Sequence, residues 1–244
     1  MTAPARWGTV GGEAAGWVSS APADVRGLVW AALGTVLDPE LDEPITELDF
    51  VESCTVSPDG VATVRLRLPT FFCAPNFSFL MVADAYDAVA AVPGVIRAEV
   101  TLADHHAAEE INGGVAAQAG FVGTFAGEAS AELDELRRVF LTKAALAGQD
   151  GVARPLVDAG ATPSELAGTT LGAVPPSPEL DRLRHRRALL GLPHDDGAPL
   201  LIDADGTPVP VARIPLHLRR ARVQRIGIET NGEYCKSLLQ TRYR

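Results

Sequence analysis

One cysteine, Cys73, lies where the sequence changes from a strand-like pattern to a helix-like pattern, in residues 68–77. The start of a helix leaves backbone N–H groups unpaired and carries a partial positive charge, so a thiol there is expected to ionise more easily than a free one. Thr70, three residues earlier, is placed to hydrogen-bond the thiolate or the loop backbone. Cys73 is therefore the first candidate for chemistry. The alternative is a small apolar residue that caps a buried helix.

An acidic turn upstream is the second candidate region. Asp38, Pro39 and Glu40 open a loop that is rich in carboxylates. Carboxylates this dense can bind a hard cation or hold a proton, whereas a solvated turn at the end of a helix is the simpler alternative. His105 and His106 follow a predicted strand, but neighbours in an extended segment point to opposite sides and rarely bind one metal together.

The cysteine content limits what kind of metal site the chain can build. Iron–sulfur clusters and structural zinc generally need four protein ligands, and the sequence has three cysteines and no C-x-x-C pair. Any cluster must then be shared between two copies of the chain, shared with a client, or completed by Asp38, Glu40 or His105. Cys235, beside Lys236, is a further candidate ligand. Cys54, in the middle of a predicted strand, is expected to pack in the core.

The elements that position these residues follow from hydrophobic spacing and turn residues. A helical pattern over residues 24–37 stops at Asp38-Pro39, because a residue before proline is disfavoured in a helix. Residues 49–56 and 61–68 alternate around Asp59-Gly60 and predict a hairpin. A buried helix over 76–92 and a strand over 95–102 follow. The expected fold is a small two-layer α/β (α+β) domain with the order helix, strand, strand, helix, strand.

The sequence changes character after His106. An Ala/Gly-rich junction precedes a helix over 128–146, a capping box at Thr162-Pro163-Ser164-Glu165, a helix from Ser177-Pro178 to Gly191 and a small hairpin within 200–211. We expect four parts: a mobile arm (1–21), an α/β domain (22–106) that is able to fold alone, a mostly helical extension (107–212) and a basic tail (213–244).

Charge sets the tail apart from the rest of the chain. The net charge is −10, yet residues 213–244 hold eight Lys/Arg against two Asp/Glu. Bulk acidity argues against nucleic acid as the main ligand. The tail predicts a docking element for an acidic partner, through Arg219, Arg220, Arg222 and Arg225, or else a solvated charged segment.

Composition excludes several other classes. No apolar run is long enough for a membrane span, and the first residues lack the features of a secretory signal. A cytoplasmic, reducing location is the default for three irregularly spaced cysteines. The motifs of α/β-hydrolases, P-loop enzymes and dinucleotide-binding enzymes are absent from the sequence.

The order helix, Asp38-Pro39-Glu40, hairpin, Pro69-Thr70 with Cys73, helix and strand resembles the metal–sulfur cluster assembly domain of the phenylacetate-degradation D protein, the SUF-associated T protein and the eukaryotic cytosolic iron–sulfur targeting factor. The resemblance covers about 80 residues. Two departures stand out: only Phe71 and Phe72 separate Thr70 from Cys73, where three residues are usual, and the 140-residue extension after His106 is absent from minimal members.

The resemblance implies a non-catalytic maturation factor that assembles, carries or delivers an iron–sulfur cluster or iron, bound transiently, to a client metalloenzyme such as a bacterial metal-dependent oxygenase. Cys73 is then the ligand or transfer thiol, supported by Asp38, Glu40 and Thr70, and the extension selects the client. A homodimer is one way to complete the site.

Two rival hypotheses come from other classes of protein. One is a thiol enzyme with Cys73 as nucleophile and His105 or His106 as base. The other is a structural or regulatory subunit of a metalloenzyme or monooxygenase complex that holds no metal of its own.

Overall fold

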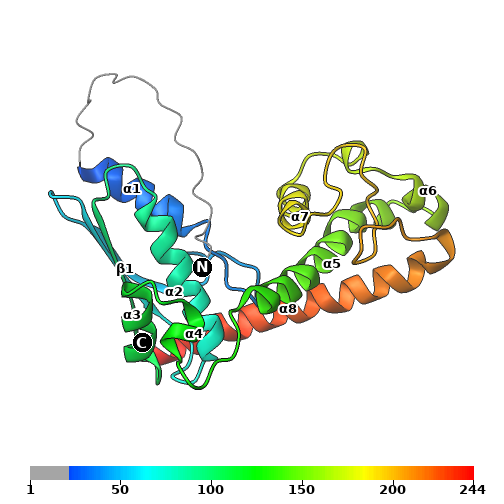
Figure 1. Ribbon diagram of the computed structural model, residues 1–244. Helices are drawn as coiled ribbons and strands as arrows, with labels where there is room; N and C mark the ends of the chain where they lie inside the picture. The colour runs from blue at the N-terminus through cyan, green and yellow to red at the C-terminus, as the bar shows by residue number, and fades with distance from the viewer. Residues whose placement is uncertain (1–21) are drawn as a thin grey trace, which may run out of the picture.

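The computed structural model describes residues 22–244, and the arm expected at 1–21 lies outside the described residues. Its first part confirms the expected mixed α/β class and element order (Figure 1). Strands β1 and β2 form an antiparallel hairpin, and β2 pairs in parallel with β3 at the sheet edge. The elements are α1 (Pro22–Leu33), β1 (Val51–Val56), β2 (Val61–Arg67), α2 (Pro75–Ala90) and β3 (Arg97–Ala103).

One face of the sheet is buried beneath α1 and α2, and the other is exposed. Side chains alternate along β2, with Ala62, Val64 and Leu66 buried and Thr63 and Arg65 exposed. This alternation is what a half-buried strand requires, because successive side chains point to opposite faces. The result is a two-layer arrangement in which α2 begins at the end of the sheet where β2 finishes.

The first core extends beyond the expected boundary at residue 106. Helices α3 (Ala108–Ala116) and α4 (Gly120–Thr124) follow β3, and Ile111 and Val115 are buried in the same core as the sheet. The Asn112 side chain accepts from the Leu102 N–H and donates to the Leu102 carbonyl, at 2.7 and 3.0 Å. The Ala/Gly-rich sequence therefore forms a close-packed helix pair rather than a junction.

The extension is built on two long helices, α5 (Asp134–Asp158) and α8 (Ile214–Arg242), which lie side by side (Figure 1). A second core at their far end includes residues of α6 (Pro163–Gly168), α7 (Pro178–Leu189) and the 3-10 turn η1 (Leu171–Ala173). A second 3-10 turn, η2 (Val211–Arg213), precedes α8 and has no buried residue. The capping box at Thr162 and Glu165 and the helix start at Ser177 are confirmed. The small hairpin within 200–211 is reduced to a single bridge between Ile202 and Pro208, because prolines cannot donate to a strand ladder.

The basic tail, residues 213–244, contributes residues to both cores. It forms α8, whose last turns return to the first core: Leu239 is 2% exposed there, and Cys235 and Tyr243 pack against the same cluster. The Arg242 guanidinium donates to the carbonyls of Leu68 and Asp104, at 3.0 and 2.5 Å. Segments more than 130 residues apart in sequence thus share one core.

Among residues 22–244, no helix combines the length and the apolar content needed to cross a bilayer.

Candidate functional site

Cys73 lies in the short loop between β2 and α2. Pro75 is the first helical residue of α2, and Ala74 is its N-cap with an extended backbone, φ −61° and ψ 128°. Cys73 therefore precedes the cap by one residue, slightly outside the expected position at the helix start. The thiol is partly buried, between two exposed neighbours, Phe72 and Ala74.

The Thr70 hydroxyl contacts the Cys73 sulfur. Thr70 Oγ1 lies 3.3 Å from Cys73 Sγ, and it also accepts from the Phe72 N–H at 3.2 Å. Because Oγ1 accepts from the backbone, its own proton is free to point at the sulfur. A hydroxyl donor in this position stabilises a thiolate more than a neutral thiol.

His105 fixes the backbone of the Cys73 loop. Its Nε2 lies 2.7 Å from the Cys73 carbonyl oxygen, and its Nδ1 accepts from the Ala107 N–H at 3.2 Å. A carbonyl can only accept, so Nε2 carries the proton. Burial lowers the pKa of this histidine, which favours the neutral ring. Both ring nitrogens are engaged, so in this arrangement His105 positions the loop instead of offering a metal ligand.

Asp38 shapes the acidic turn from a buried position. Its Oδ1 accepts from the N–H groups of Glu40 and Leu41, both at 2.8 Å, and the residue is 7% exposed. Burial raises the pKa of Asp38 to about 6, against the opposing effect of these two hydrogen bonds. Glu40 is exposed beside it. The turn thus holds one buried and one solvated carboxylate.

Helix α8 brings Cys235 to the first core, a contact that could not be predicted from local sequence patterns. Burial, together with the neighbouring charges of Asp38, Cys73 and Glu40, raises the pKa of the Cys235 thiol to about 11. One residue on, Lys236 Nζ lies 2.8 Å from Glu43 Oε2 in the acidic loop. Cys235 and Cys73 therefore pack against the same core, and the Lys236–Glu43 ion pair joins α8 to the acidic loop.

The site is incomplete as a metal centre. Within the described part of the chain, no three His, Cys, Asp or Glu side chains are grouped closely enough to hold a metal ion. Cys54 does not contribute: it lies in β1 opposite Val64, packs against the first core, and burial raises its pKa. The three cysteines are free thiols.

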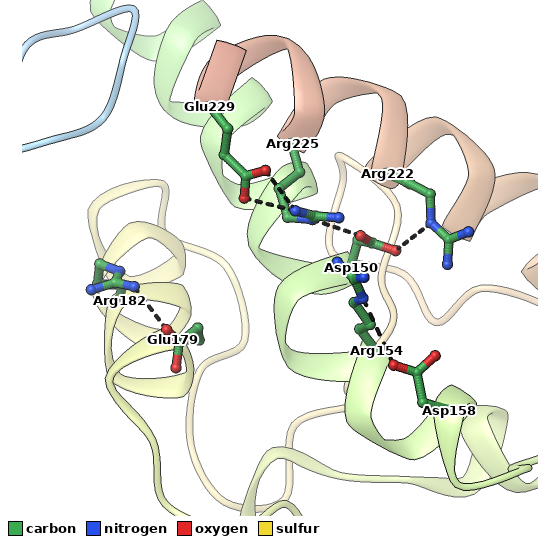
Figure 2. Close-up of polar contacts among 8 residues, drawn as sticks. All are labelled: Asp150, Arg154, Asp158, Glu179, Arg182, Arg222, Arg225 and Glu229. Atoms are coloured by element: carbon green, nitrogen blue, oxygen red, sulfur yellow. Dashed lines mark hydrogen bonds and ion pairs between the residues drawn. The ribbon is translucent and has the colours of Figure 1, made fainter. Parts of the chain in front are cut away.

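The four arginines expected to bind a partner divide into two pairs. Arg225 Nε donates to the buried Asp150 at 2.8 Å and its Nη1 to Glu229 at 2.7 Å, while Arg222 Nε lies 3.7 Å from Asp150 (Figure 2). These two arginines join α8 to α5. Arg219 and Arg220 are exposed and form no ion pair with any described residue.

A cavity of about 750 Å³ separates the acidic loop from α5, α7 and α8. The buried ion pair of Asp42 with Arg186 crosses it, and Glu179 and Arg182 of α7 face it opposite Arg225 and Glu229 (Figure 2). The Asp42–Arg186 pair joins the acidic loop of the first part to α7 of the extension, 144 residues away in sequence.

The comparisons with known proteins concern the first part of the chain. Residues 27–102 match a sequence family described as "Iron-sulfur cluster assembly protein". This segment includes α1, the acidic turn, the sheet, the Cys73 loop and α2. Residues 27–102 are therefore similar to iron–sulfur cluster assembly proteins, and we refer to this segment as the assembly domain.

Proteins named "Iron-sulfur cluster carrier protein" are among the relatives of this domain. The one from Mycobacterium tuberculosis is 38% identical over 79 residues, and the one from Mycobacterium leprae is 39% identical over 80 residues. The matched segments cover 32% and 33% of this chain, and in both cases a fifth of the relative's own length. The resemblance inferred from the motifs is therefore confirmed for the assembly domain, and the extension lies outside the matched segments.

A solved structure is also similar, a domain of unknown function, DUF59, from Bacillus anthracis. It is 24% identical, covers 33% of this chain and 76% of its own, and the TM-score is 0.31.

Proposed function

We propose that the protein assembles, carries or delivers an iron–sulfur cluster, or iron, and that Cys73 is the thiolate that binds the cargo. The match of residues 27–102 to the assembly family and the names of the relatives support this role. The contacts of Cys73 suit a ligand: a hydroxyl at its sulfur and a histidine that holds its carbonyl. Asp38 and Glu40 shape the neighbouring turn.

The observation that carries the proposal is that α8 packs Cys235 against the same core as Cys73. Thiolates are the preferred ligands of iron–sulfur clusters. The thiol of Cys235 has a pKa of about 11, so binding of a cationic cargo must displace its proton. Cys235 is thus expected to bind second, after Cys73 has captured the cargo. The extension then contributes a ligand that the assembly domain alone lacks.

Two thiols are fewer than the four ligands that a cluster generally takes. The remaining ligands would come from exogenous thiols, a client or a second copy. Incomplete coordination suits a cargo that has to leave. Phe71 and Phe72, which are 45% and 76% exposed, lie directly before Cys73 and offer an apolar contact to a client. Metal-dependent oxygenases are one class of client to be tested.

The test is anaerobic reconstitution with ferrous iron and sulfide, followed by iron and sulfide analysis and visible absorption. Cys73→Ser should abolish binding, and Cys235→Ser should weaken it and speed loss of the cargo to a chelator. Cys54→Ser is the matched control and should behave like the wild type. If Cys73→Ser retains the wild-type content of iron and sulfide, the proposal is wrong.

The two rivals predict other outcomes. A thiol enzyme needs a base at the nucleophile, but His105 contacts the Cys73 carbonyl rather than its sulfur, and His106 Nδ1 contacts the Phe71 carbonyl at 3.0 Å. The contacts thus give this rival no support. A metal-free structural subunit would co-purify with its complex in fixed stoichiometry and would be indifferent to Cys73→Ser.

A further inference from the structure

The outward face of α8 carries apolar side chains that no described element covers. Leu216 and Val223 are 48% and 67% exposed, and Ile226 and Tyr234 are 48% and 64% exposed. The opposite face of the same helix packs on α5, and Ala221 and Arg225 lie there. In Figure 1, α8 runs along an edge of the protein with α5 on one side only. Several exposed apolar groups on one helix face indicate an interaction surface.

The spacing of this face is that of a helix-pairing seam. The exposed residues alternate at intervals of four and three positions, which keeps a stripe facing one partner helix. From Leu216 to Tyr234 the stripe extends about 27 Å along the helix. We call it the α8 seam; its members are Leu216, Arg220, Val223, Gly227, Thr230 and Tyr234.

The seam is symmetric about position 225, so it can pair with itself in antiparallel orientation. A second copy would place its Tyr234 opposite Leu216, its Thr230 opposite Arg220, and its Gly227 opposite Val223. Gly227 has open space where a Cβ would stand, which leaves room for Val223 of the second copy. Parallel pairing would instead set Arg220 against Arg220, which is unfavourable. An interface that uses the same surface on both copies is the usual basis of a twofold dimer.

The charges that flank the seam are complementary in the same register. On one flank lie Arg219, Ile226 and Glu233, seven residues apart. In antiparallel helices this flank faces its own copy, so Ile226 meets Ile226 at the twofold axis and Arg219 meets Glu233 of the second copy, twice. Arg219 is exposed without an ion pair to a described residue, and the Glu233 side chain is 80% exposed. Such flanking pairs set orientation and partner choice in coiled coils.

We propose that the protein forms an antiparallel homodimer through the α8 seam, with Ile226 at the twofold axis and Arg219 paired with Glu233 of the second copy. This inference does not depend on the metal proposal, because the seam lies on the face of α8 away from the core that packs Cys235. The two cargo sites would lie at opposite ends of the paired helices. Since one helix pair buries less surface than most stable interfaces, the dimer is expected to dissociate on dilution.

Sedimentation equilibrium of the full chain over a range of concentrations tests the proposal. The wild type should approach twice its 25.6 kDa mass as concentration rises. Ile226→Asp should be monomeric, whereas Leu189→Asp, at another exposed leucine on α7, should dimerise like the wild type. Circular dichroism of each variant checks that the helices are intact. If the wild type stays monomeric up to millimolar concentration, the proposal is wrong, and the exposed face of α8 is then available to a different partner.

A charge exchange tests the register without changing apolar side chains. Arg219→Glu and Glu233→Arg should each weaken dimerisation at least tenfold, because like charges would then face each other, and the double variant should recover most of the loss. Failure of the double variant to recover contradicts the antiparallel register. Ile226→Cys should form an intermolecular disulfide at that position under mild oxidation, located by mass spectrometry; a crosslink confined to Cys54, Cys73 or Cys235 also contradicts it.

Discussion

The buried polar side chains of the two cores serve different purposes. In the first core they are Asp38, which accepts hydrogen bonds within the acidic turn, and Ser78 and His105, which contact the carbonyls of Ala74 and Cys73. In the extension they bind structural elements together: the Gln149 side chain accepts from the Ile202 N–H, and the fully buried Arg187 donates to the carbonyls of Pro199 and Leu200. Buried polar side chains therefore lie near the candidate site in the first core. In the extension they hydrogen-bond the backbone of segments that form no regular helix or strand.

The largest effect should come from the buried ion pair of the extension. Arg225→Met leaves Asp150, whose side chain is 3% exposed, with only the longer contact to Arg222. We expect a loss of about 3–5 kcal/mol in the free energy of unfolding, because an uncompensated charge stays buried. Arg222→Met is the matched control and should cost under about 1 kcal/mol, since that arginine is half exposed. Urea denaturation measures the free energy of unfolding of both variants. Equal losses in Arg225→Met and Arg222→Met would contradict the role of Arg225 as the main partner of Asp150.

The packing of the last turns of α8 against the first core should give the next largest effect. Leu239→Ala should lower the free energy of unfolding by about 2–5 kcal/mol, the usual cost of emptying a leucine site in a core. Leu189→Ala, at an exposed leucine, should stay within about 0.5 kcal/mol of the wild type. A neutral Leu239→Ala would mean that the last turns of α8 detach in solution, and that Cys235 does not stay near Cys73.

Asp38 should make stability depend on pH. Its pKa is about 6 in the folded protein and about 3.9 in an unfolded chain, so the folded state holds the proton more tightly. The contribution of Asp38 to stability is therefore greatest below pH 4 and falls by as much as about 3 kcal/mol as pH rises through 6.

Asp38→Asn keeps an oxygen acceptor for the turn but removes the titration. The difference in unfolding free energy between the variant and the wild type should change in favour of the variant between pH 4 and 6.5. A difference that is constant over this range would show that Asp38 is not buried as described.

Thr70→Val should have the smallest effect on stability. It removes the hydroxyl that accepts from the Phe72 N–H, at a cost of about 0.5–1.5 kcal/mol in the free energy of unfolding. It also removes the contact with the Cys73 sulfur, so alkylation of Cys73 near neutral pH should slow. Thr63→Val, on the exposed face of β2, is the control. If Thr70→Val leaves the rate of Cys73 alkylation unchanged, Thr70 does not affect the reactivity of the thiol.

Local patterns predicted much of the first region. The Asp59-Gly60 turn, the alternation along β2 and the Thr70–Cys73 spacing are features of neighbouring residues, and Gly60 adopts the left-handed backbone, φ 81°, that this turn needs. The family motifs lie within this same stretch. Sequence reasoning could therefore propose Cys73, Asp38 and Thr70 as site residues without knowledge of the rest of the fold.

Contacts between distant segments were not predictable in the same way. The inward face of α8 carries Gly232 and Ala221 beside Leu239, so its apolar periodicity is weak. The tail was predicted to be a docking element, or else a solvated charged segment, because its basic charge contrasts with the acidity of the rest of the chain. In the structure Arg225 binds the buried Asp150 instead. Nothing local marked Cys235 as packing against the same core as Cys73.

The distance along the chain between the two thiols has a consequence for biosynthesis. Cys235 follows Cys73 by 162 residues. At translation rates of 5–20 residues per second, Cys73 leaves the peptidyl-transferase centre roughly 8–32 s before Cys235 is made. A nascent chain thus presents only one thiol of the pair, together with the exposed Phe72, during that interval. Under the proposal that Cys73 and Cys235 both bind the cargo, stable loading therefore requires that α8 has been synthesised and has folded back on the first core.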